Sequence, residues 1–253
     1  MNDRPESEGE RKFLAEYDAA AFPHPSLTVD VVLLTARADG LWALLLQRSE
    51  HPDRARWALP GGFVRIDEGL DEAAARILEE KAGLRDLFLE QLYTFGEPKR
   101  DPRTRVVTVA YYALVPAERL AGVAGDDGKR ETATMGRLRV SWPGETGGPA
   151  EALDGKGASL PLAFDHAEIL GMAVKRLRGK LDYAPVGYQL LPETFTLRDL
   201  QRIHELVSGR KLNKDSFRRR MLASGDLEAT GQLNRSVDYR PPELYRFVRR
   251  SAV

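Results

Sequence analysis

Two apolar segments near the beginning of the chain are separated by a single turn signal. Residues 27–37 and 41–48 are rich in β-branched and apolar side chains, and Asp39-Gly40 lies between them. An Asp-Gly pair between two such segments favours a tight turn. The pattern therefore predicts a β-hairpin as the start of the first folded domain.

A helical pattern follows the glycines at 61 and 62. Apolar side chains recur at intervals of three and four residues from Leu70 to Leu78, and Gly83 supplies a C-terminal stop. This spacing predicts a helix over residues 70–82. Further along the chain, the same domain is expected to contain strands at 88–95, 106–114 and 138–142, Gly-rich loops at 122–136 and 143–159, and a closing helix at 165–181.

The C-terminal part of the chain has a different pattern. Thr196 and Asp199 form a capping-box-like start to a helix that ends at Gly209, and Asn213 can cap a second helix that ends at Gly225. Two short extended segments, 227–232 and 239–248, come next. Two helices joined by a tight turn and followed by a hairpin predict a winged helix-turn-helix. We expect an N-terminal arm at 1–20, a first domain at 21–182 and a second domain at 183–253.

Composition narrows the class of protein. A chain of 253 residues is long enough for two domains, and the complete lack of cysteine excludes disulfides, thiolate zinc sites and cysteine nucleophiles. The apolar segments are much shorter than the roughly 20 residues that cross a bilayer, and the charged N-terminus has no apolar segment behind it. We therefore expect a cytoplasmic protein that does not enter the membrane.

Charge is distributed unevenly along the chain. Lys and Arg number 38, as do Asp and Glu, but from residue 194 onward there are 13 basic and only 7 acidic residues. A basic segment of this kind is compatible with an anionic partner and also with a solvated face that merely aids solubility. Charge by itself leaves both interpretations open.

One motif has a fixed spacing over more than twenty residues. The chain matches the pattern G-x5-E-x7-R-E-U-x-E-E-x-G-U, where U is apolar, at Gly62, Glu68, Arg76, Leu78, Glu80, Gly83 and Leu84. This segment resembles the Nudix box. The resemblance implies a Nudix domain that binds a nucleoside diphosphate derivative.

Two positions depart from the box. The family places metal-binding glutamates where this chain has Ile77 and Lys81. Hard divalent cations need several oxygen ligands, and Lys81 puts an ammonium group where the cation would bind. We expect no catalytic residues and no metal, and hence a domain that binds its ligand without hydrolysing it. The alternative is a working hydrolase that uses displaced ligands such as Glu79 or Glu97.

A basic loop follows the box. Residues 95–112 resemble the corresponding stretch of the ADP-ribose-directed branch of the Nudix family, and arginines there suit a diphosphate because the guanidinium binds phosphate oxygens in pairs. Phe95 or Trp57 is a candidate to stack on a base. A solvated hairpin tip is the alternative. The candidate ligand-binding residues are Arg48, Trp57, Gly61, Gly62, Phe63, Arg76, Glu80, Lys81, Phe95, Arg103 and Arg105.

An altered box, an ADP-ribose-type loop and a C-terminal winged helix together resemble the NrtR family, the Nudix-related transcriptional regulators of NAD metabolism. The resemblance covers nearly the whole chain, from Tyr17-Asp18 through the Thr28-Val29-Asp30 segment to Val248. It implies an α+β architecture: a Nudix α/β/α sandwich with a mixed sheet, followed by a winged helix-turn-helix domain. It also implies a homodimeric repressor of NAD biosynthesis or salvage genes. Such a repressor binds palindromic double-stranded DNA, requires no cofactor, and releases the DNA when ADP-ribose or a related NAD metabolite binds as effector.

Basic and polar side chains crowd the second helix of the C-terminal domain and its surroundings. In helix-turn-helix proteins such residues contact base edges or phosphates, although three consecutive arginines cannot share one helical face. A basic module that docks onto a protein is the alternative. The candidate DNA-binding residues are Thr196, Arg210, Lys211, Asn213, Lys214, Ser216, Arg218, Arg219, Arg220, Thr230, Asn234 and Arg235.

The rival hypothesis for the whole chain is a metal-dependent ADP-ribose pyrophosphatase with an accessory winged-helix domain. Release of AMP from ADP-ribose in the presence of Mg²⁺ or Mn²⁺ distinguishes the two hypotheses. A ligand bound at the Nudix domain can regulate DNA binding only if its affinity differs between two arrangements of the protein.

Overall fold

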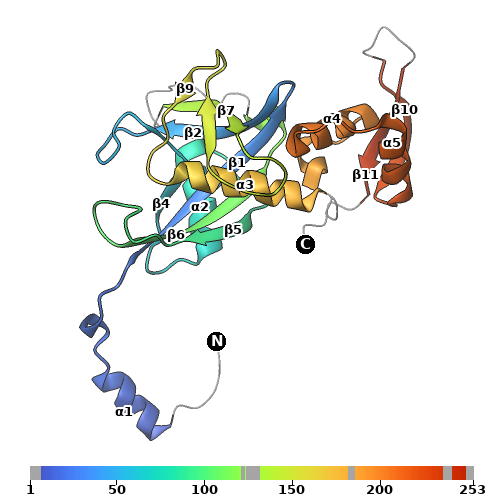
Figure 1. Ribbon diagram of the computed structural model, residues 1–253. Helices are drawn as coiled ribbons and strands as arrows, with labels where there is room; N and C mark the ends of the chain where they lie inside the picture. Colours follow the sequence, from blue (N-terminus) through green and yellow to red (C-terminus); the bar gives the residue numbers. More distant parts are fainter. Residues whose placement is uncertain (1–6, 121–122, 124–131, 182–185, 236–240, 249–253) are drawn as a thin grey trace.

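The computed structural model describes residues 7–120, 123, 132–181, 186–235 and 241–248. A mixed sheet forms the centre of the first domain (Figure 1). Its strand order is β5-β6-β1-β2-β7-β8-β9, with β1 parallel to β6 and antiparallel to β2. The principal strands are β1 (Ser26–Arg37), β2 (Gly40–Gln47), β5 (Glu90–Phe95) and β6 (Val106–Leu114). Two short strands, β3 (Trp57–Ala58) and β4 (Gly61–Phe63), pair with β2 and β1.

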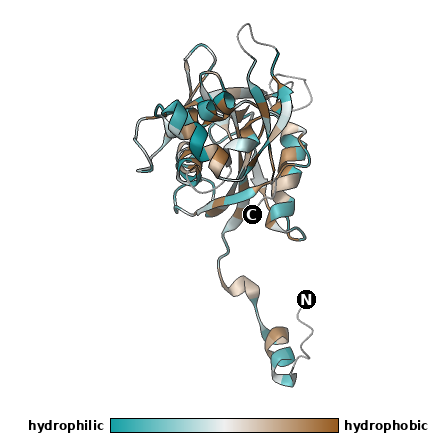
Figure 2. Cartoon of the chain, turned by 90° about the vertical axis from the view of Figure 1, so that its right-hand side faces the viewer, coloured by the Kyte–Doolittle hydropathy of each residue, from teal (hydrophilic) through white to brown (hydrophobic). Residues whose placement is uncertain are grey.

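Helices cover both faces of this sheet. Alternate residues of β1 point to opposite sides: Val29, Val31 and Leu33 pack with α2 (Leu70–Ala82), whereas Val32 and Leu34 pack with α3 (His166–Lys180). A strand buried on both faces has a continuous apolar sequence, as β1 does. The central strands are the most hydrophobic part of the domain in Figure 2. The arrangement is an α/β/α sandwich.

The ends of α2 and α3 agree with their sequence signals. Helix α2 has the expected bounds. At its N-terminus the Glu72 carboxylate accepts a hydrogen bond from the Gly69 N–H. After its last turn Gly83 adopts a left-handed conformation with φ 67°. Helix α3 begins one residue after the expected position and ends one residue before it. Local periodicity therefore predicted both helices, and the terminal glycine predicted the end of α2.

The second domain contains α4 (Leu197–Ser208), α5 (Lys214–Ala223) and the hairpin β10–β11 (Leu227–Leu233 and Glu243–Phe247). Thr196 and Asp199 form the capping box of α4, and Asn213 caps α5, as expected from the sequence. Phe195 in front of α4 pairs with Tyr245 of β11. A short 3₁₀ helix, η3 (Val186–Leu190), precedes this domain.

The two domains share apolar contacts. The cluster of buried side chains under α3 continues through Leu190 and Leu191 to Leu200 and Val207 of α4. The basic C-terminal domain is thus packed against the first domain through apolar contacts between α3 and α4.

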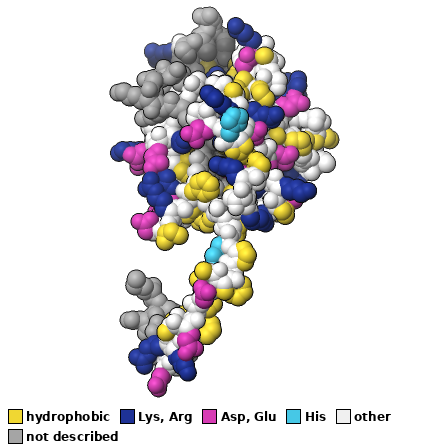
Figure 3. Space-filling model, turned by 90° about the vertical axis from the view of Figure 1, so that its left-hand side faces the viewer, with side chains coloured by type: hydrophobic (Ala, Val, Ile, Leu, Met, Phe, Trp, Pro, Cys, Tyr) yellow, Lys and Arg dark blue, Asp and Glu magenta, His cyan; other side chains and the backbone are white. Residues whose placement is uncertain are grey.

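The N-terminal segment stands away from both domains (Figure 3). It contains α1 (Glu8–Glu16) and the short 3₁₀ helix η1 (Ala19–Ala21), neither of which has a buried residue. Within the described ranges, no helix combines the length and the apolar character required to span a bilayer.

Three strands correct the expectation for the region after β6. Strand β7 (Ala133–Val140) starts inside the loop expected at 122–136, and β8 (Ala150–Leu153) and β9 (Ser159–Leu160) lie in the loop expected at 143–159. A further 3₁₀ helix, η2 (Ala117–Leu120), precedes them. Strands β8 and β9 have only four and two residues, and β7 contains Gly136, so sheet pairing rather than local sequence stabilises them. Residues 121–122 and 124–131 around the first loop, 182–185 of the connection, and 236–240, which include the first two residues of the extended segment expected at 239–248, lie outside the described residues.

Candidate functional site

A pocket of about 440 Å³ opens where β1 and β4 meet the loop after β5. Residues of β4 and of six other segments of the chain surround it. Its lining comprises Thr28, Asp30, Arg48, Ser49, Glu50, Ala58, Leu59, Gly61, Gly62, Phe63, Lys81, Arg100, Asp101, Arg103, Val106, Phe164 and His166. This volume lies in the range of small-molecule sites.

A buried network of charges forms the floor. Arg100 binds Asp165 through two hydrogen bonds of 2.7 and 2.8 Å, and its Nη2 lies 3.5 Å from Asp30 Oδ2. Thr108 donates to the same Asp30 oxygen at 2.8 Å. Burial by itself would lower the pKa of Arg100, but its hydrogen bonds with Asp165 and the charge of Asp30 raise it. The network consequently fixes the loop after β5 against β1 and the start of α3.

Gly61 permits the close approach of β4 to this network. A Cβ atom at position 61 would lie 2.2 Å from Asp30 Oδ1, which no side chain tolerates. The glycine is thus needed where a buried carboxylate touches backbone.

His166 completes the floor as a neutral ring. The Leu59 N–H donates to His166 Nδ1 at 2.9 Å, so the proton of the neutral imidazole is on Nε2, which lies 3.7 Å from Asp30 Oδ1. Complete burial lowers the pKa of His166 and outweighs the opposing effect of Asp30. The imidazole positions the backbone beside the pocket rather than supplying a positive charge.

Two arginines and two aromatic rings form one wall. The guanidinium carbon of Arg48 lies 4.6 Å from the Phe164 ring centroid, and that of Arg103 lies 6.0 Å from it and 5.8 Å from the Phe63 centroid. Asp101 holds Arg103 by hydrogen bonds of 2.7 and 3.0 Å. The wall therefore combines flat apolar surfaces with guanidinium groups, which suits a ligand that contains both a base and phosphates.

The structure brings six of the eleven sequence-based ligand candidates into this pocket: Arg48, Gly61, Gly62, Phe63, Lys81 and Arg103. The other five, Trp57, Arg76, Glu80, Phe95 and Arg105, do not line it. Trp57 and Phe95 pack against the core under α3, and Arg105 donates to the carbonyls of Glu97 and Val106.

Arg76 and Glu80 belong to an ion-pair cluster outside the pocket. Arg76 binds Glu68 through its Nε at 2.8 Å and its Nη2 at 2.5 Å, and its Nη1 contacts Glu80 at 3.1 Å. Arg65 approaches the other oxygen of Glu80 at 3.2 Å. The hydrogen bonds from Arg76 lower the pKa of Glu68 to about 2. Glu68 thus holds the turn before α2 through its bonds with Arg76 and the Arg65 N–H.

The two altered box positions have different surroundings. Ile77 is 1% exposed and belongs to the core under α2, whereas Lys81 lines the pocket. Glu79 pairs with Arg85. In the described part of the chain, no three His, Asp or Glu side chains are grouped so as to hold a metal ion. The donor set near the altered positions does not fit a divalent metal, because Glu79 and Glu80 are bound by arginines and Lys81 lines the pocket.

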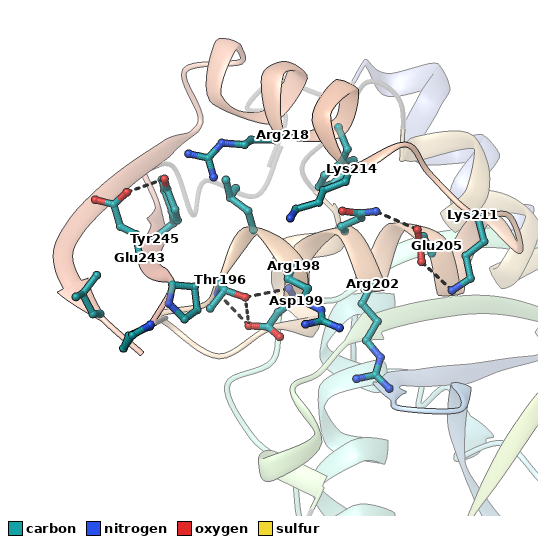
Figure 4. Close-up of a pocket in the computed structure, with 16 residues that line it drawn as sticks. Thr196, Arg198, Asp199, Arg202, Glu205, Lys211, Lys214, Arg218, Glu243 and Tyr245 are labelled. Atoms are coloured by element: carbon teal, nitrogen blue, oxygen red, sulfur yellow. Dashed lines mark hydrogen bonds and ion pairs between the residues drawn. The ribbon is translucent and has the colours of Figure 1, made fainter. Parts of the chain in front are cut away.

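A second cavity, of about 1510 Å³, lies in the C-terminal domain between α4, α5 and the hairpin (Figure 4). We refer to it as the cationic groove. Five basic side chains line it: Arg198, Arg202, Lys211, Lys214 and Arg218. Their separation in the sequence, across two helices and a turn, explains why the fold is needed to bring them together.

The candidates for DNA binding take several structural roles. Thr196 is 5% exposed and caps α4, Asn213 caps α5, and Lys211 forms an ion pair with Glu205. Thr230 donates to the carbonyl of Leu244 within the hairpin. The remaining eight candidates, Arg210, Lys214, Ser216, Arg218, Arg219, Arg220, Asn234 and Arg235, lie on the α4–α5 turn, on α5 or on the hairpin arm.

The three consecutive arginines of α5 separate as helical geometry requires. Phe217 is buried, Arg218 lines the cationic groove, and the Arg220 guanidinium lies 5.7 Å from the Phe217 ring. At roughly 100° per residue, Arg219 projects away from the buried side of the helix. Arg219 is thus the arginine of this trio that faces outward from α5.

Sequence reasoning missed residues in both places. In the pocket it assigned no role to Asp30, Arg100, Phe164 or His166, and in the groove it overlooked Arg198 and Arg202. Asp30 and Arg100 lie in segments that the sequence analysis noted only for their resemblance to the family. The four-residue spacing of Arg198 and Arg202 places both arginines on one face of a helix, and this spacing could have identified them. No local pattern marks Phe164 or His166.

Comparisons with known proteins place each domain in a family. The model of the NrtR DNA-binding winged helix domain matches residues 187–247, and the NUDIX domain model matches residues 24–135. An ADPR responsive transcriptional repressor, NtrR, of Acinetobacter baylyi is 38% identical over 94% of this chain and 88% of its own length.

Solved structures extend the similarity to the whole fold. The crystal structure of Shewanella oneidensis NrtR complexed with a 27mer DNA has a TM-score of 0.69 and 35% identity, covering 87% of this chain and 93% of that one. A MutT/nudix family protein from Enterococcus faecalis has a TM-score of 0.70 and 29% identity, covering 96% and 100%. These matches confirm the expected architecture of a Nudix-like domain with a mixed sheet and a C-terminal winged helix.

Proposed function

Because this chain belongs to the NrtR family of Nudix-related transcriptional regulators, we propose that it is a DNA-binding repressor whose Nudix domain senses ADP-ribose. The observation that carries the proposal is similarity to an ADPR responsive repressor over 94% of the chain, including both domains. The proposed targets are genes of NAD biosynthesis or salvage. The proposed domains are residues 21–182 for sensing and 183–253 for DNA binding, with an arm at 1–20.

The pocket chemistry supports an ADP-ribose-like ligand. Arg48 and Arg103 provide guanidinium groups for the two phosphates, and Phe164 and Phe63 provide rings beside them. Lys81 adds an ammonium group to the lining. We propose that these residues, with Gly61 and Gly62, bind the effector. The other sequence-based candidates, Trp57, Arg76, Glu80, Phe95 and Arg105, are proposed to support the pocket from outside.

We propose that the Nudix domain binds without hydrolysing. Hydrolysis in this family depends on metal-held water, and here Ile77 is buried while Glu68 and Glu80 are bound by Arg76 and Arg65. A metal would have to displace these arginine contacts and approach Lys81, both of which are unfavourable.

The DNA-facing residues are proposed on the same basis. Arg219 and Ser216 project from α5 for the major groove, because the second helix of a helix-turn-helix lies there. The other candidates around the turn and hairpin contact phosphates or hold the helices in place. Palindromic half-sites require a two-fold assembly, so the proposed active form is a homodimer. A cytoplasmic location is part of the proposal.

Communication between the sites is proposed to pass through α3. This helix begins beside the pocket, where Asp165 binds Arg100, and ends against α4, where Arg178 donates to the Val207 carbonyl at 2.9 Å. A helix of 15 residues spans about 22 Å as a stiff element. A ligand that moves the first turn of α3 would also displace α4. At equilibrium the ligand increases the population of the domain arrangement to which it binds more tightly.

The test begins with the purified full-length protein and a pool of random double-stranded DNA. Repeated selection should enrich a palindrome, and fluorescence anisotropy should then show that added ADP-ribose weakens binding to it. Failure to enrich any sequence contradicts the DNA-binding proposal. An unchanged affinity in saturating ADP-ribose contradicts the effector proposal.

The same preparation tests for hydrolysis. We expect ADP-ribose to remain intact with Mg²⁺ or Mn²⁺ under conditions in which an added Nudix ADP-ribose pyrophosphatase releases AMP. Catalytic release of AMP by this protein would favour the rival hypothesis of a hydrolase with an accessory domain.

A further inference from the structure

The cationic groove lies between two rows of basic side chains. Arg198 and Arg202 are one turn apart on α4, and Lys214 and Arg218 are one turn apart on α5. All four are exposed. In Figure 4, Lys214 extends from α5 toward α4, and the Arg218 guanidinium points toward Tyr245 of the hairpin. The groove therefore presents cations from both helices to the same space.

The acidic side chains of the groove are already engaged. Asp199 accepts hydrogen bonds from Thr196, Glu205 accepts from Lys211 and Gln201, and Glu243 accepts from the Tyr245 hydroxyl. Among the described residues, Lys211 is the one groove cation that forms an ion pair. The charges of the other four thus remain unbalanced by described carboxylates, which favours an extended anion along the groove.

The two arginines of α4 differ in one contact. Arg202 donates from its Nη2 to the carbonyl of Ala38, 3.1 Å away, in the turn between β1 and β2 of the Nudix domain. Figure 4 shows the Arg202 side chain extending from α4 toward those strands. No such contact to the first domain is found for Arg198 within the described residues. The chain thus contains a matched pair of arginines on one helix.

We propose that Arg198 and Arg202 both contact the DNA phosphate backbone, and that the Nudix domain positions Arg202 through the Ala38 carbonyl. A guanidinium has five N–H donors, so a bond to Ala38 leaves others for a phosphate. The first helix of a helix-turn-helix crosses the DNA backbone, which places α4 suitably. This inference rests on the proposed function.

The contact with Ala38 makes Arg202 sensitive to the arrangement of the two domains. A hydrogen bond is lost when its atoms separate by more than about half an ångström beyond the usual distance. The bond spans two domains whose relative position α3 and Arg178 help to fix. A ligand-driven shift of α3 therefore changes how Arg202 is held, whereas Arg198 moves with α4 alone.

The experiment compares Arg198→Ala and Arg202→Ala in the full-length protein. Affinity for the selected duplex is measured by anisotropy over a range of salt concentrations, with and without ADP-ribose. Each variant should reduce the slope of log K against log salt by about 1.8, because a homodimer on a palindrome loses one phosphate contact in each of its two subunits. The factor by which ADP-ribose weakens binding should fall about threefold or more in Arg202→Ala and stay at the wild-type value in Arg198→Ala.

Arg202→Lys provides a further check because it keeps the charge. Its salt slope should return to the wild-type value. Circular dichroism melting of each variant controls for unfolding, which is not expected at exposed positions.

Two results would overturn the inference. A wild-type salt slope in Arg202→Ala would exclude a phosphate contact by Arg202. If the factor by which ADP-ribose weakens DNA binding changed equally in the two alanine variants, positioning of Arg202 by the Nudix domain would be excluded. These are distinct from a wild-type protein that selects no duplex or ignores ADP-ribose, because either of those results contradicts the proposed function itself.

Discussion

Arg178 of α3 and Val207 of α4 are joined by a hydrogen bond of 2.9 Å from the arginine Nε to the valine carbonyl. The same guanidinium donates to the carbonyls of Trp142 and Gly144 and lies 4.8 Å from the Trp142 ring. One side chain therefore connects the last turn of α3 to the Trp142–Gly144 loop of the Nudix domain and to α4 of the C-terminal domain.

Replacing Arg178 should weaken this connection. We expect Arg178→Leu to lower the free energy of unfolding by about 2 kcal/mol, because several partly buried carbonyls lose their donor. The effect of ADP-ribose on DNA affinity should also decrease. Denaturant unfolding and DNA titrations measure the two effects. Arg176→Leu is the matched control, since Arg176 donates to Leu92 inside the Nudix domain. Equal loss of the ADP-ribose effect in both variants would argue against a role for the connection to α4.

Arg100 should be essential for stability of the pocket floor. Its side chain is 5% exposed and faces Asp165 and Asp30. Arg100→Met leaves both carboxylates without their cation, and we expect a loss of about 3–5 kcal/mol in the free energy of unfolding. Adding Asp165→Asn should recover part of that loss, because one uncompensated charge is removed. A cost below about 1 kcal/mol in urea unfolding would contradict the account of the network.

Phe164 should contribute to ligand affinity although no sequence pattern marked it. We expect Phe164→Leu to weaken ADP-ribose binding about tenfold in calorimetry, since the flat ring beside Arg48 and Arg103 is lost. Phe95→Leu is the control, because Phe95 does not line the pocket. A larger effect at Phe95 than at Phe164 would mean that the ligand binds elsewhere.

Restoring the box carboxylates tests the account of metal binding. In the double variant Ile77→Glu and Lys81→Glu, the new carboxylate at 77 replaces a side chain that is 1% exposed, so the protein should be less stable without metal. Millimolar Mn²⁺ should then raise its melting temperature, because a metal that binds only the folded state stabilises it. The variant with glutamines at both positions should not respond. No difference between the glutamate and glutamine variants would contradict the prediction.

His166 should make stability depend on pH. Burial lowers its pKa below the ordinary value of 6.5. Below pH 6.5 the unfolded chain gains a proton at this ring while the folded chain does not, until the lower folded pKa is reached. The free energy of unfolding should therefore fall with decreasing pH, by at most about 1.4 kcal/mol per unit. Melting curves of His166→Gln should lack this component, whereas those of His24→Gln, altered at an exposed histidine, should retain it.

The sequence by itself determined the elements whose signals are local. Apolar spacing and a terminal glycine fixed α2, an Asp-Gly pair fixed the β1–β2 hairpin, and side-chain caps fixed the starts of α4 and α5. The spacing of the Nudix box also showed which two glutamates are missing. Each of these features lies within one short continuous segment of the chain, where local backbone geometry relates the residues.

Only the tertiary structure decided which residues meet. Asp30, Arg100 and His166 come from three distant segments, and the parallel pairing of β1 with β6 brings the first two together while α3 delivers the third. Strands β7 to β9 are likewise stabilised by pairing with neighbouring strands of the sheet rather than by their own sequence. Pairing order and packing are long-range properties, so the same short segment is compatible with many neighbours until the whole chain has buried its apolar faces.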